Sequence, residues 1–174
     1  MLRKKVEFTR PGIIKIFLVC LLIQVSIGCQ RDDICSAATQ TTPMLNIVFF
    51  DAEDPDLPKP PSNLIIREIH YDTIIHDRVN SSELRIPLRP DANTTRYEFI
   101  LNAPVEGSPD ESNSDLVLFT YDPREIYISR ACSFKVNFMD LEAELESGDN
   151  WIQEISVEVE NIENETQPHI IIYH

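Results

Sequence analysis

The sequence predicts an all-β protein, an antiparallel β-sandwich of immunoglobulin-like layout with about eight strands and at most one short helix. Its apolar residues fall in short runs rich in β-branched and aromatic side chains, and Pro, Asp, Asn and Ser gather between these runs. Several runs alternate apolar and polar residues with a period of two, as a strand with one buried face does. A small closed barrel is the alternative architecture.

Eight runs are predicted to be strands, and the spacing between them leaves no room for parallel βαβ units. Alternation is clear in the seventh run, where Ile155, Val157 and Val159 face away from the acidic residues between them. The last run, HIIIYH, is apolar on both sides, so we expect it to be covered on both faces. One segment, MDLEAELES at residues 139–147, could form a short helix. The predicted strands are residues 45–50, 63–69, 83–88, 96–101, 115–121, 125–138, 152–162 and 169–174.

The segment around Cys132 reads as one long strand that carries a charge in an apolar row. With a period of two, the row contains Ile126, Ile128, Arg130, Cys132, Phe134, Val136 and Phe138. An unpaired buried charge is very costly, so Arg130 either points inward with a partner or is turned outward by a bulge at residues 130–131. The bulge is the favoured interpretation.

Residues 1–28 have the pattern of a bacterial lipoprotein signal peptide. The basic stretch MLRKKVEFTR precedes the apolar run IFLVCLLIQVSI, which is shorter than the 20 or so residues, about 30 Å of helix, needed to span a bilayer. The residues SIGC then resemble a lipobox in which Ser26 stands where Leu is usual. We therefore expect Cys29 to carry a lipid that anchors the chain in the outer membrane. An ordinary secretory signal that ends near a cysteine is the alternative.

The rest of the chain divides into a lipidated tether, residues 29–36, and a single domain, residues 37–174. The predicted signal contains five of the chain's 15 Lys and Arg residues and one of its 29 Asp and Glu residues. The rest of the chain therefore holds 10 basic and 28 acidic residues. Such an acidic chain repels nucleic acid, which is therefore not an expected partner.

The four cysteines are expected to serve different purposes. Cys20 lies in the signal and Cys29 is used by the lipid, so Cys35 and Cys132 remain in an exported chain where disulfides persist. A bond between them is the favoured interpretation, and two free buried thiols are the alternative.

Candidate chemical sites are weak. The acidic run at Asp51, Glu53, Asp54 and Asp56 offers oxygen ligands for Ca²⁺ but fails the EF-hand pattern, so a solvated loop is favoured. His70 and His76 could share a strand face but have no third ligand at metal spacing, and His169 and His174 flank the last strand, where solvent contact is expected. The sequence has no HExxH, no GxSxG and no glycine-rich phosphate loop. We therefore expect no catalytic residues, no metal and no cofactor.

Several segments together, in order, resemble a family of small Bacteroidota lipoproteins catalogued as a domain of unknown function, 6452. They are CQRDDIC, PMLNIVFFD, LRIPL, YISRACSFKVNF, DNWIQEISVEVENIEN and HIIIYH. The resemblance implies a lipidated all-β envelope protein and brings no activity or catalytic residue.

Two local patterns are similar to signals of the same phylum. Gln30, Arg31, Asp32 and Asp33 resemble a surface-export signal, for which a plain charged tether is the alternative. Thr73, in DTI, resembles an O-glycosylation acceptor.

These observations predict a non-enzymatic binding or scaffolding module that is anchored at the outer membrane and can rest against an outer-membrane β-barrel protein. The alternative is a glycan-active enzyme or glycan-binding protein that uses carboxylates and Trp151. Trp151 could stack on a sugar, although such a residue more often caps a core.

Overall fold

The computed structural model describes residues 34–107, 109–146 and 148–174, and the regular elements within them are all β-strands. No helix in these residues could cross a membrane. The nine strands are β1 (Leu45–Phe50), β2 (Leu64–Glu68), β3 (Thr73–Val79), β4 (Glu83–Ile86), β5 (Thr94–Leu101), β6 (Asn113–Ser129), β7 (Ser133–Leu145), β8 (Glu154–Val157) and β9 (Ile170–Tyr173).

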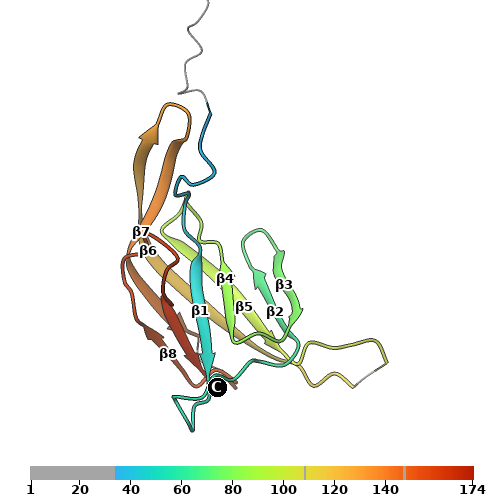
Figure 1. Ribbon diagram of the computed structural model, residues 1–174. Helices are drawn as coiled ribbons and strands as arrows, with labels where there is room; N and C mark the ends of the chain where they lie inside the picture. The colour runs from blue at the N-terminus through green and yellow to red at the C-terminus, as the bar shows by residue number, and fades with distance from the viewer. Residues whose placement is uncertain (1–33, 108, 147) are drawn as a thin grey trace, which may run out of the picture.

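The strands form two sheets that pack against each other (Figure 1), with orders β4-β1-β9-β8 and β3-β2-β5-β6-β7. Neighbouring strands are antiparallel except β1 and β9, which run parallel. The predicted all-β class and two-sheet architecture are confirmed. Neither sheet closes on itself among the described residues, so the barrel alternative is wrong.

The core lies between the sheets because alternation along the strands turns every second side chain inward. In β4, Leu84 and Ile86 are buried while Glu83 and Arg85 are exposed. Burial of one large apolar side chain stabilises a fold by roughly 1.5–3 kcal/mol. The largest fully buried side chains come from both sheets and include Tyr97, Phe49, Phe99, Phe119, Phe138, Leu45, Ile47 and Ile66.

The prediction of one strand over residues 125–138 is wrong, because the chain reverses inside that segment. Residues 130–132 form the turn of a hairpin between β6 and β7, in which Ser129 pairs with Ser133. The Ser129 hydroxyl accepts a hydrogen bond from the Cys132 amide at 3.1 Å, and Ser133 has a left-handed φ of 61°. Arg130 is exposed in this turn, so neither a strand bulge nor a buried ion pair is needed.

The predicted short helix is also wrong, because residues 139–145 belong to β7. Residues 142–145 pair with 117–120 of β6, and Leu141 is buried in the core. Pairing with a long neighbouring strand overrides the helical spacing of the leucines.

The structure differs from the sequence-based prediction at three further strands, two at sheet edges and one in a sheet centre. β3 was not predicted as a strand, and β8 ends at Val157 although alternation continues beyond it. In β9, Ile170 and Ile172 are buried while Ile171 and Tyr173 are partly exposed, so β9 is fully covered on one face only.

Candidate functional site

A projecting arm is the most distinctive part of the fold. Residues 113–120 of β6 pair with β5, but β6 beyond Tyr121 pairs only with β7. We call residues 124–137, the far part of this hairpin, the arm. Figure 1 shows the arm extending away from the two sheets, with the first described residues running beside it.

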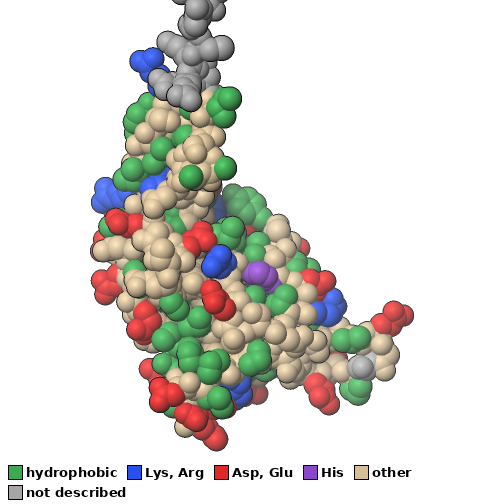
Figure 2. Space-filling model, in the orientation of Figure 1, with side chains coloured by type: hydrophobic (Ala, Val, Ile, Leu, Met, Phe, Trp, Pro, Cys, Tyr) green, Lys and Arg blue, Asp and Glu red, His purple; other side chains and the backbone are tan. Residues whose placement is uncertain are grey.

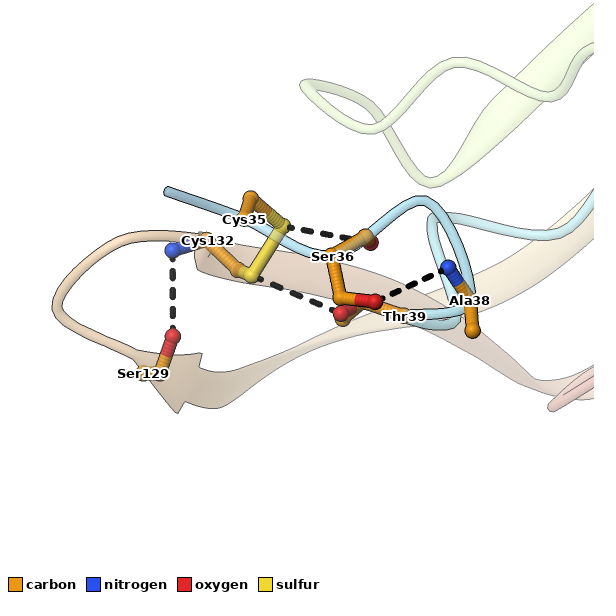
Figure 3. Close-up of a disulfide and its surroundings, with 6 residues drawn as sticks. All are labelled: Cys35, Ser36, Ala38, Thr39, Ser129 and Cys132. Atoms are coloured by element: carbon orange, nitrogen blue, oxygen red, sulfur yellow. Dashed lines mark hydrogen bonds between the residues drawn. A yellow bond between two sulfur atoms is a disulfide. The ribbon is translucent and has the colours of Figure 1, made fainter. Parts of the chain in front are cut away.

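A disulfide fastens the chain to the arm, as the sequence predicted. Cys35 is bonded to Cys132, 97 positions later, and their Cα atoms are 4.8 Å apart. Figure 3 shows the bond beside the hairpin turn, with Thr39 Oγ1 3.6 Å from the Cys132 sulfur. The segment before β1 is thereby held at the far end of the arm.

Hydrogen bonds continue this attachment toward the base of the arm. The Val136 amide donates to the Thr42 hydroxyl at 2.9 Å. Lys135 is 7% exposed, and its ammonium donates to Gln40 Oε1 and the Glu163 carbonyl, each at 3.2 Å. Because a buried ammonium must keep its hydrogen bonds, Lys135 ties together β7, the N-terminal segment and the loop before β9.

The far end of the arm exposes apolar side chains. Tyr127 and Phe134 are each 57% exposed, and their rings are 5.3 Å apart in an edge-to-face arrangement. Ile126 is 39% exposed, and Ile34, beside the arm, is 84% exposed. Figure 2 shows hydrophobic side chains along this projection. We call Ile34, Ile126, Tyr127 and Phe134 the apolar tip.

The predicted lipid and export residues are outside the described part of the chain. Cys29 and the run Gln30, Arg31, Asp32 and Asp33 belong to the residues that the structure does not describe. Thr73, the predicted glycosylation acceptor, is exposed at the start of β3, and its hydroxyl donates to the Tyr71 carbonyl at 3.2 Å.

The acidic run after β1 has the features of a solvated loop. Asp51 Oδ1 accepts the Glu53 amide at 2.8 Å, and Asp51 Oδ2 pairs with the Lys59 ammonium at 3.3 Å. The Glu53 amide hydrogen bond is the main cause that lowers the pKa of Asp51. Glu53, Asp54 and Asp56 are exposed. Within the described residues no His, Cys, Asp and Glu side chains group as three potential metal ligands.

The first two histidines do not share a strand face. His70 is exposed in the turn after β2, whereas His76 lies in β3 with its Nε2 2.8 Å from the Arg85 carbonyl. The two rings therefore do not form a pair for metal binding.

The expectation of solvent contact beside the last strand is wrong for His169, which is buried, whereas His174 stays partly exposed. His174 is partly buried, with Nε2 2.9 Å from the Lys59 carbonyl. Its ring lies edge-on to Trp151 at 5.3 Å. Trp151 Nε1 donates to the Phe99 carbonyl at 3.0 Å, and its ring packs against the core. Trp151 therefore caps the core, and this contact leaves it poorly placed to stack on a sugar.

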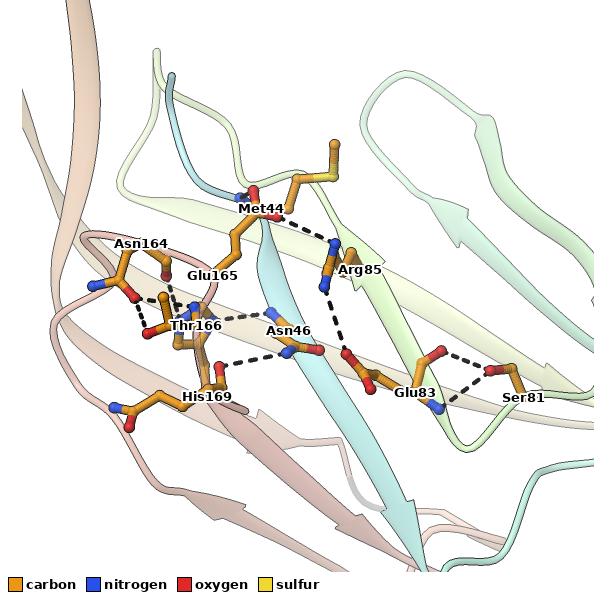
Figure 4. A network of polar contacts seen from close by, with 10 residues as sticks. Met44, Asn46, Ser81, Glu83, Arg85, Asn164, Glu165, Thr166 and His169 are labelled. Atoms are coloured by element: carbon orange, nitrogen blue, oxygen red, sulfur yellow. Dashed lines mark hydrogen bonds and ion pairs between the residues drawn. The ribbon is translucent and has the colours of Figure 1, made fainter. Parts of the chain in front are cut away.

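His169 is the more deeply buried of the two, at 1% exposed. Its Nδ1 accepts the Asn46 amide at 2.9 Å, so Nε2 carries the proton and donates to the Asn164 carbonyl at 2.9 Å. Figure 4 shows this ring among the polar contacts that hold the loop before β9 to β1 and β4. In the same network Glu165 accepts the Met44 amide at 2.8 Å and lies 3.6 Å from Arg85.

Stability should fall as the pH drops below the ordinary histidine pKa of 6.5. Burial lowers the pKa of His169 and of His174, so the unfolded chain binds protons there before the folded chain does. Their contribution is complete above pH 6.5 and is lost progressively below it. Thermal unfolding between neutral and mildly acidic pH measures this slope. His169→Gln should flatten it, while the exposed control His70→Gln should keep the parent's slope; an unchanged slope in His169→Gln contradicts the assignment.

Sequence reasoning missed the apolar tip because it took residues 125–138 as one strand. Read as a hairpin, the same residues place Tyr127 opposite Phe134. A signal was present in the sequence: Ser129, Arg130 and Ser133 interrupt the apolar run, and polar residues of this kind favour turns.

Comparison with known proteins identifies a protein family, and the function of that family is unknown. The model of a family described as a family of unknown function, DUF6452, matches residues 63–174. This region includes β2 to β9 and Cys132, and it begins after Cys35. No curated protein and no solved structure matches the chain.

Proposed function

The chain belongs to the family of unknown function DUF6452, and we propose that it is a lipid-anchored envelope protein whose β-sandwich serves as a non-enzymatic binding module. The observation that carries this proposal is the disulfide between Cys35 and the arm. The predicted lipid residue, Cys29, precedes Cys35 by six positions. A chain spans at most about 3.3–3.6 Å per residue, so the arm would stay within roughly 20 Å of the lipid.

The composition of the apolar tip supports contact with a bilayer surface. From Ile126 to Phe134 the sequence holds one charged residue, Arg130, and no acid, although the chain as a whole is strongly acidic. Tyr and Phe suit the boundary between headgroups and acyl chains, and an arginine there meets anionic lipid. The tip would thus rest on the membrane that the lipid enters, and an outer-membrane β-barrel protein in that membrane would meet the domain at this end.

The alternative of a glycan-active or glycan-binding protein used carboxylates and Trp151. Trp151 is engaged with the core and with His174, which removes the sugar-stacking part of that alternative. A binding role held at the membrane therefore fits the described residues better.

Lipidation can be tested directly with labelled palmitate. We expect Cys29→Ala to lose the label and to leave the membrane fraction, because the remaining apolar contacts at the tip are too few to anchor a domain alone. The matched control is Cys20→Ala, which removes a thiol from the predicted signal and should keep both the label and the membrane location. A Cys29→Ala protein that still takes up label and stays in the membrane overturns the proposed anchor.

A further inference from the structure

A hollow of about 450 Å³ opens between the β2–β3 turn and the loop that joins β4 to β5. It lies at the end of the sandwich that bears the arm, because the hydroxyl of Tyr121, just before the arm, donates to the Arg89 carbonyl in that loop at 2.9 Å. Its volume is in the range of small-molecule sites. Most of its lining is apolar or aromatic and comes from Tyr71, Ile75, Pro87, Leu88, Pro90 and Tyr97.

Glu68 contributes to the lining of this hollow, and one of its carboxylate oxygens has no hydrogen-bond partner among the described residues. Glu68 ends β2, pairs with Tyr97 of β5, and is 4% exposed. Its Oε2 accepts the Tyr71 amide at 2.6 Å, whereas its Oε1 is buried and has no partner among the described residues. A buried acceptor without a donor costs free energy, so a ligand that donates to Oε1 would be favoured.

The other polar groups of the lining are already paired. The Arg89 guanidinium donates to both carboxylate oxygens of Asp91, at 3.2 and 3.0 Å, and lies 5.1 Å from the centre of the Tyr71 ring. The Tyr97 hydroxyl donates to the Pro87 carbonyl. With Arg89 neutralised by Asp91, Glu68 leaves the hollow with net negative character. An anion would therefore be repelled, and a sugar with many hydroxyls would find few partners.

We propose that this hollow binds a small molecule that carries a protonated amine on an apolar or aromatic body. The ammonium donates to Glu68 Oε1, and the body packs against Tyr71, Pro87 and Leu88. This assignment rests on the binding role proposed above and names its ligand class. It is independent of the lipid on Cys29.

The test compares phenethylammonium with phenylpropionate, which has a similar ring and chain but the opposite charge. Titration calorimetry on the full chain in mild detergent at neutral pH measures both. We expect saturable binding of the amine and binding of the acid that is weaker by about tenfold or more, because a charge-assisted hydrogen bond is replaced by charge repulsion.

Glu68→Gln keeps the side chain's shape and an acceptor for the Tyr71 amide, but removes the charge. It should weaken amine binding by about tenfold or more. The matched control is Glu142→Gln, an exposed acid on β7, which should bind as the parent does. Equal binding of amine and acid, or an unchanged affinity in Glu68→Gln, overturns the assignment.

A measurement on the parent keeps the test independent of how Glu68→Gln folds. In an NMR titration with phenethylammonium, the Tyr71 amide should shift, because it donates to the same carboxylate that the ligand reaches. No shift at Tyr71, or shifts centred on Trp151 instead, overturns the site. These experiments are done in detergent, so they do not depend on the anchor. A protein that takes up palmitate but binds no amine would overturn the ligand assignment and leave the proposed anchor standing. A protein that binds the amine but takes up no palmitate would overturn the anchor and leave the ligand assignment standing.

Discussion

Replacing Cys35 by serine is expected to lower the free energy of unfolding by roughly 2–5 kcal/mol, and the melting temperature by several degrees. The bond closes a loop across 97 positions of sequence, so its loss returns much conformational freedom to the unfolded chain. In the folded protein, the N-terminal segment would keep its hydrogen bonds through Thr42 and Gln40 but lose its covalent attachment.

The design of this experiment separates the bond from the side chains. Cys35→Ser, Cys132→Ser and the double variant should melt alike, because each removes the same bond and the effects of bonded partners do not add. Thr39→Ala, a neighbour of the Cys132 sulfur, should melt within about 0.5 kcal/mol of the parent. A peptide map without reductant checks the pairing. If the Cys35 and Cys132 peptides separate and Cys35→Ser is as stable as the parent, the disulfide is absent. The short distance between the proposed lipid and the arm would then lose its basis as well.

Phe138→Ala should destabilise the fold by about 3–5 kcal/mol, the usual cost of deleting a buried phenylalanine ring. Phe138 is fully buried, and its ring lies edge-on to Tyr121 at 5.1 Å. Its backbone also exchanges two hydrogen bonds with Ile162, at 3.1 and 2.7 Å, so it connects β7 to the segment after β8. A cavity at this position would open where β7 leaves the body to form the arm.

The same strand supplies the control. Phe134 lies four residues earlier in β7 but is 57% exposed at the apolar tip, so Phe134→Ala should change the free energy of unfolding by less than about 1 kcal/mol. Urea unfolding of the two variants measures the contrast. Similar decreases in the free energy of unfolding for both variants would mean that Phe134 is packed as tightly as Phe138, which contradicts the structure.

The sequence was sufficient for the all-β class and for most strands because their signal is local. Alternation at Leu84 and Ile86 and the β-branched content of residues 45–50 depend only on nearby residues. The disulfide was also accessible, because the prediction that Cys20 lies in a signal and that Cys29 carries a lipid leaves Cys35 and Cys132 as partners.

Features that depend on contacts between residues far apart in the sequence could not be predicted from the sequence. Pro123 falls between the predicted strands 115–121 and 125–138, yet it lies inside β6 opposite Phe138. The Phe138 backbone groups bond to Ile162 and not to β6, so Pro123 needs no amide hydrogen there. His169 reads as a polar residue at a strand end, and only the fold brings the Asn46 amide to its ring. The buried Glu68 likewise gave no signal, because its neighbours across the hollow come from separate strands and loops.

The parallel pair of β1 and β9 has a consequence for when the protein can fold. Ile47 pairs with Ile170, so the strand at the centre of one sheet is the last of the described strands to be synthesised. Until it emerges, β1 is paired with β4 on one side and is unpaired on the other, and the inward face of the second sheet lacks part of its cover. Pairings between residues this far apart slow folding, since a long loop must close before they form. The two sheets would therefore complete their packing only after the segment that carries β9 has been synthesised.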